Sequence, residues 1–149
     1  MWYQPNAANV KSLLVSDVEW SVLTDGLPEG TTIDDLVAEG LSAAVGDIRF
    51  AVASGGRNKG QAGEIPDECN SCLMPLVRRC IFGRLTGGAA DKLFTKTRTQ
   101  DALRADKKLD DISHHDRGID PPADVAAVQS AGPPVDLVSL EESGWSHFR

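Results

Sequence analysis

All three cysteines of the chain lie in one short stretch, ECNSCLMPLVRRC. Cys69 and Cys72 form a C-x-x-C pair, and Cys80 follows further along the same stretch. A C-x-x-C pair can bind zinc when other cysteines or histidines complete a tetrahedral site, and it can carry redox chemistry inside a βαβ unit. The same spacing places the three thiols on one helical face beside Leu73 and Leu76, where cysteine packs as a small hydrophobe. We expect this packing role, with Leu73, Leu76 and Cys80 in the core and no metal or cofactor.

The histidines offer the other candidates for chemistry. His114 or His115 could complete a zinc site, but zinc ribbons place the C-x-x-C pair on a tight turn, whereas this pair continues as a helix. The run His114-His115-Asp116 could also be catalytic. Adjacent residues on a helix, however, point about 100° apart and do not converge on one substrate atom. No serine lies in a nucleophile-elbow pattern. We therefore expect no enzyme, with a small cysteine-based metal-binding or redox protein as an alternative.

Length, composition and charge limit the class of protein. The 149 residues suffice for one domain, but only 41% are hydrophobic and 5% aromatic, which indicates a modest core with extended segments. The net charge of -7 argues against a protein whose main task is to grip DNA, because phosphate contacts depend on Lys and Arg. Neither a signal peptide nor an apolar run of about 18 residues is visible. We expect a soluble protein, made in the cytoplasm and without a membrane partner.

A long helix is predicted directly after the sequence PEGTT. Thr32 and Asp35 have the spacing of a capping box, and acidic residues follow in the first turn, where the helix dipole favours them. An apolar stripe then recurs at helical spacing, formed by Val37, Leu41, Ala44, Ile48 and Val52. Leu41 and Ile48 are therefore core candidates. Gly40 and Gly46 either cost this helix up to about 1 kcal/mol each or mark the close approach of another backbone.

The sequence SGGRNKGQAGE ends this helix. Its lysine among glycines resembles a phosphate-binding loop only superficially, because the G-x-x-x-x-G-K-[ST] order is absent and no strand precedes it. We expect a flexible loop between two helices.

Two further helices are predicted. The cysteine-containing helix starts near Pro66, contains the unfavourable Pro75 and stops at Thr86-Gly87-Gly88. A more polar helix spans Thr97 to about Ser113 and carries a narrow apolar stripe of Ala102, Ala105, Leu109 and Ile112. Leu109 completes the core candidates. Asp101–Arg104 and Lys107–Asp110 have the spacing of ion pairs on one helix.

Both ends of the chain carry large aromatic residues in segments that bury little on their own. Residues 1–32 are expected to be an N-terminal arm with a short helix, and the proline-rich residues 119–149 an extended C-terminal arm. Exposed aromatic side chains are unfavourable unless they dock on their own domain or on a partner. The candidates for a partner interface are Trp2, Tyr3, Leu137, Leu140, Trp145 and Phe148.

The order of these parts resembles the head–tail connector (adaptor) proteins of tailed bacteriophages. The likeness lies in LVAEGLSAAVGDIRFAV, the glycine loop, IPDECNSCLMPLVRRCIFGRL and RTQDALRADKKLDDISHHDRGI. Within these stretches, the residues most similar to the family are Ile65-Pro66, the run from Leu76 to Leu85, and the run from Ala102 to Gly118. It covers about residues 33–118, and the cysteine-rich helix start with Pro75 and the two arms depart from it.

The resemblance implies a ring-forming virion subunit, dodecameric in relatives, at the neck between head and tail. Such a ring lies below the portal, extends the DNA channel without specific DNA binding, and meets the tail or a stopper or terminator protein. Carried onto this chain, contact with the portal would fall to residues 119–149, with Trp145 and Phe148 as anchors.

Sequence and resemblance together predict a mainly α protein. We expect a small bundle of about three to four helices in residues 33–118, with extended N- and C-terminal arms. A different neck or tail-completion protein, of a kind usually richer in β-strands, is a second alternative.

Overall fold

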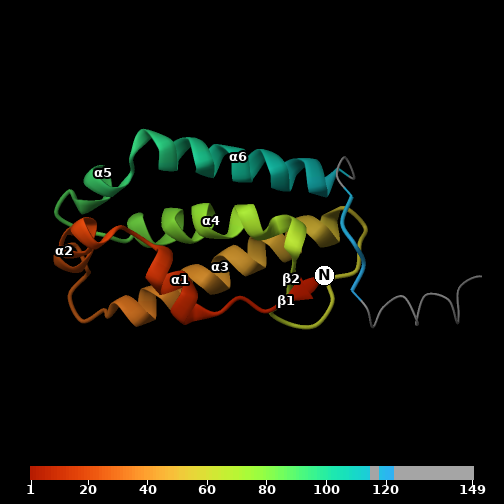
Figure 1. Cartoon of the computed structure of the whole chain (residues 1–149), viewed down its shortest axis with the longest axis horizontal. Coiled ribbons are helices and arrows are strands. Elements are labelled where there is room, and N and C mark those ends of the chain that lie inside the picture. Colours follow the sequence, from red (N-terminus) through yellow and green to blue (C-terminus); the bar gives the residue numbers. More distant parts are fainter. Residues whose placement is uncertain (115–117, 123–149) are drawn as a thin grey trace, which may run out of the picture.

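Three long helices form the body of the chain in the computed structural model, which describes residues 1–114 and 118–122 (Figure 1). They are α3 (Ile33–Ser54), α4 (Asn70–Phe82) and α6 (Lys96–Ser113), and each of them packs against the other two. Shorter helices are α1 (Ala7–Leu13), α2 (Trp20–Asp25) and α5 (Ala89–Leu93), with 3-10 turns at Asp17–Glu19 and Asp67–Cys69. The predicted mainly helical bundle is therefore confirmed.

Helix α3 begins where its capping signal predicts. Thr32 Oγ1 accepts a hydrogen bond from the backbone N–H of Asp35 at 3.2 Å, and the Asp35 carboxylate accepts one from the Thr32 N–H at 3.3 Å. The two glycines of this helix differ in their surroundings. Gly40 is buried against α4, where an added Cβ would lie 3.0 Å from Ile81 Cγ1, whereas nothing lies within 4 Å of such an atom at Gly46. Close approach therefore explains Gly40 alone.

Helix α4 is the central helix and packs most extensively on α3 and α6. It starts later than the sequence predicts, because a 3-10 turn at Asp67–Cys69 precedes it, and it ends at Phe82 rather than at residue 86. It continues through Pro75, which lies in its second turn and removes one backbone donor there. Ile48, Leu73 and Leu76 are buried in the core around this helix.

Three of the expected core residues lie at the rim of the core instead. Leu41 and Leu109 are half-buried and pack against the buried cluster. Cys80 is also half-buried, so the expectation that it lies in the core with the other two cysteines is corrected. Its neighbours at the rim include the charged residues Glu39 and Arg84, both of which are exposed.

Residues 1–32 form part of the bundle. Helix α1 packs on α3, and Val10, Leu14 and Leu23 are buried in the common core. The apolar residues of this segment are divided between α1, the 3-10 turn at Asp17–Glu19 and α2. In that arrangement Leu13 is 59% exposed and Val18 is 86% exposed.

The N-terminus pairs with the segment before α4. The strands β1 (Trp2–Tyr3) and β2 (Ile65–Pro66) form an antiparallel pair in which Trp2 lies opposite Pro66 and Tyr3 opposite Ile65. The glycine loop between α3 and β2 is held as well, since Arg49 donates hydrogen bonds of 2.7 Å to the carbonyls of Lys59, Gln61 and Glu64. These bonds correct the expectation of a flexible loop.

Within the described residues, no helix is both long and apolar enough to span a membrane.

A candidate docking groove between helices α4 and α6

Burial sets the chemistry of the C-x-x-C pair. Cys69 and Cys72 are 0% exposed and form no disulfide, and Cys72 Sγ lies 3.9 Å from the carbonyl oxygen of Ala105. Burial, and then the neighbouring Cys72, raise the pKa of Cys69 to about 12. Burial also raises the pKa of Cys80, with Glu39 adding to the shift. Because the thiolate is the form that attacks disulfides and binds metals, these thiols are poorly suited to either task.

One of the two histidines considered as a possible fourth zinc ligand, His114, lies at the end of α6. His114 Nδ1 is 2.8 Å from the carbonyl oxygen of Asp110, at the helix C-terminus. His115 and Asp116 lie outside the described residues. Among residues 1–114 and 118–122, no group of three or more His, Cys, Asp or Glu side chains has an arrangement that could hold a metal ion.

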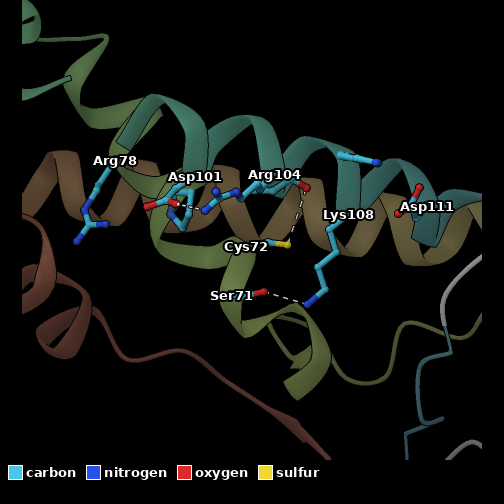
Figure 2. Close-up of a pocket in the computed structure, with 10 residues that line it drawn as sticks. Ser71, Cys72, Arg78, Asp101, Arg104, Lys108 and Asp111 are labelled. Atoms are coloured by element: carbon cyan, nitrogen blue, oxygen red, sulfur yellow. Dashed lines mark hydrogen bonds and ion pairs between the residues drawn. The ribbon is translucent and has the colours of Figure 1, made fainter. Parts of the chain in front are cut away.

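A groove of about 740 Å³ runs between α4 and α6 (Figure 2). Helix α4 supplies Ser71, Cys72, Pro75 and Arg78, and α6 supplies Asp101, Arg104, Ala105, Lys107, Lys108 and Asp111. Cys72, Pro75 and Ala105 give it an apolar part, whereas four cations and two carboxylates line the rest. The groove therefore combines apolar surface with an excess of positive charge in a protein of net charge -7.

Two of the four cations are engaged with backbone carbonyls. Arg78 donates hydrogen bonds to the carbonyls of Leu13 and Leu14, at 2.6 and 2.9 Å, and so fastens the end of α1 to α4. Lys108 Nζ donates to the carbonyl of Glu68 and, at 2.9 Å, to Ser71 Oγ. Neither contact neutralises the cation, so both add positive potential to the groove.

The other two cations are more accessible. Arg104 is 77% exposed and pairs with Asp101 at 3.4 Å, which is a long and weak ion pair. Lys107 is exposed, and in the described part of the chain it does not form the expected pair with Asp110. Asp110 lies instead 3.5 Å from His114 Nδ1. Arg104 and Lys107 are thus the side chains best able to meet an incoming carboxylate.

The sequence contained a signal for this groove that our prediction did not use. Arg104, Lys107 and Lys108 follow one another at helical spacing on a helix with a thin apolar stripe. The contribution of Arg78 depends on the packing of α4 beside α6, which the sequence pattern does not specify.

The aromatic residues proposed as partner contacts divide into two groups. Trp2 and Tyr3 are half-buried on their own chain, where Trp2 Nε1 donates to the carbonyl of Asp120 at 2.7 Å and the Tyr3 hydroxyl to Asn70 Oδ1 at 2.6 Å. They dock on their own domain, so less of their surface is left for a partner. The other four, Leu137, Leu140, Trp145 and Phe148, lie outside the described residues.

Comparison of the chain with protein-family models, with curated proteins and with solved structures finds no match.

Proposed function

We propose that this chain is a non-enzymatic structural subunit of a tailed-phage particle, acting as a head–tail adaptor. Copies of the chain assemble into a ring below the portal, with twelve subunits as the expected number. The ring extends the DNA channel and joins the capsid to the tail or to its stopper or terminator protein. The protein is made in the host cytoplasm and ends in the neck of the virion.

The observation that carries this proposal is the arrangement of the parts that bear the resemblance. Helices α3, α4 and α6 follow one another with the glycine loop between the first two, and all three pack into one body. The proposed role in a phage particle rests on the likeness of this helix order to that of phage adaptors. The packing of the three helices into one body supports that role.

The ends of the body are also suited to a part that joins two others. The N-terminus and residues 118–122 lie at one end, whereas α2 and α5 lie at the other (Figure 1). Towards the α2 end, Leu13 and Val18 expose apolar side chains. The segment that carries Leu13 and Val18 is fixed to the bundle at two points. Arg78 donates a hydrogen bond to the Leu13 carbonyl, and Arg98 forms an ion pair with Glu19. Exposed apolar residues on a fixed segment can contribute to an interface.

The two alternatives fit the described residues less well. A metal or redox protein would need accessible thiolates, but the pKa of Cys69 and of Cys80 is raised and Cys72 is buried. A terminator-like protein would be richer in strands, whereas the described residues contain a single pair of two-residue strands.

Electron microscopy of the protein mixed with the portal from its source particle tests the proposal. We expect an additional ring coaxial with the portal, on the side that faces the tail. Portal particles with no added density at a saturating concentration of the chain would contradict it.

A further inference from the structure

The groove between α4 and α6 lies close to the point where the described chain ends. The backbone N–H of Asp120 donates to Glu68 Oε1 at 3.1 Å, and the carbonyl of the same Glu68 accepts a hydrogen bond from Lys108, which lines the groove. The last described residue, Pro122, follows directly and is buried. The C-terminal segment therefore starts beside one end of the groove.

The length of that segment is sufficient to reach any part of the groove. The groove follows α4 from Ser71 to Arg78, about 10 Å at the helical rise of 1.5 Å per residue. Residues 123–134 can span roughly 40 Å when extended. The residues that follow them can thus lie along the groove of their own chain.

The composition of residues 135–142 matches the groove. This stretch, VDLVSLEE, combines four valines and leucines with three carboxylates, at Asp136, Glu141 and Glu142. Its valines and leucines suit the apolar part of the groove at Pro75, which is half-buried, whereas Cys72 and Ala105 lie buried beneath it. Its carboxylates suit the accessible cations of the groove, Arg104 and Lys107, and an attraction of this kind selects one binding surface over others on an acidic protein.

We propose that residues 135–142 bind in the α4–α6 groove of their own chain, with the carboxylates of Glu141 and Glu142 facing Arg104 and Lys107. A tethered segment needs little intrinsic affinity, because the tether gives it a high effective concentration. In the free protein this contact would cover the groove and keep residues 135–142 bound to their own chain. The contact does not depend on the proposed role in a phage particle.

Hydrogen exchange of the full-length chain, read at the backbone amides of residues 135–142, tests the contact. We expect these amides to be protected, and the double substitution Arg104→Glu, Lys107→Glu to reduce protection about tenfold or more. The reciprocal change Glu141→Lys, Glu142→Lys should have the same effect, and the two together should restore protection. Lys92→Glu and Lys96→Glu, exposed and outside the groove, form the matched control and should change nothing.

Several results would overturn the proposal. These are unprotected amides in the wild-type chain, protection that is insensitive to charge reversal in the groove, and loss of protection in the control. Protection that falls on dilution would show that the segment binds a second copy instead of its own chain. If the chain did not bind the portal, the adaptor role would be contradicted but the protection of residues 135–142 would be unchanged. The adaptor role and the groove contact can therefore be contradicted independently.

Discussion

Arg98 and Glu19 form a two-pronged ion pair between α6 and the turn before α2. Arg98 donates to both carboxylate oxygens, at 2.7 and 2.8 Å, and both side chains are largely shielded from water. The guanidinium carbon also lies 5.6 Å from the centre of the Phe82 ring, whose own edge contact with Phe94 has a centroid distance of 5.3 Å. Arg98 thus joins the N-terminal segment to α4 and α6, and the Phe82–Phe94 contact adds the link that precedes α6.

The ion pair predicts a specific dependence of stability on pH. Hydrogen bonding to Arg98 lowers the pKa of Glu19 from 4.5 to about 2. The stabilisation is therefore complete above pH 4.5 and is lost as the pH falls from 4.5 through 2. Glu19→Gln should lower the free energy of unfolding at neutral pH by about 1 kcal/mol and weaken its decrease over that interval. Urea unfolding at several pH values measures both, with exposed Glu29→Gln as the control.

The glycines of α3 provide a second prediction from matched variants. Gly46→Ala should raise the free energy of unfolding by up to about 1 kcal/mol, because alanine favours the helix and the site is open. Gly40→Ala should lower it by about 1 kcal/mol or more, since the new Cβ would press on the fully buried Ile81. Chemical denaturation compares the two. Equal stabilisation by both changes would show that α3 and α4 are not in close contact at Gly40.

The cysteines should differ in reactivity. A thiol reagent at neutral pH should label the half-buried Cys80 in the folded protein, and should reach Cys69 and Cys72 only through unfolding. Cys69→Ser should lower the free energy of unfolding by about 1–3 kcal/mol through burial of a hydroxyl, and Cys80→Ser by less than about 0.5 kcal/mol. Mass spectrometry follows the labelling, and metal analysis should find no zinc. One zinc per chain, lost in Cys80→Ser, would support the metal-binding alternative.

Removal of the C-terminal residues separates folding from assembly. A chain truncated after Gly132 keeps every contact that the described residues make with one another, so its helical circular dichroism should resemble that of the full chain and it should still fold. It lacks Leu137, Leu140, Trp145 and Phe148, so assembly with the portal should be lost. A truncated chain that unfolds, or one that still assembles, would contradict this division of roles.

Local signals account for most of the fold that could be predicted. The capping pair Thr32–Asp35 fixes the start of α3, and the apolar stripes of α3, α4 and α6 identify the bundle, because both features depend only on residues close in sequence. Contacts between distant residues were missed. The pairing of Trp2 with Pro66 and the three bonds of Arg49 to the glycine loop depend on tertiary packing that no local pattern specifies.

The candidate groove shows the same limit. The cations of α6 are visible in the sequence, but their meeting with Arg78 and with the apolar surface of α4 follows from how the helices pack. The cysteines drew attention first because of their spacing. Burial, which spacing alone does not determine, decides that Cys69 and Cys72 belong to the core while Cys80 lies at its rim.

Native mass spectrometry of this protein mixed with the portal of its source particle tests the central claim most directly. The proposed adaptor role predicts a complex that carries many copies of the chain per portal ring, close to one copy per portal subunit. A chain that stays free at concentrations well above those of the portal would contradict the adaptor role.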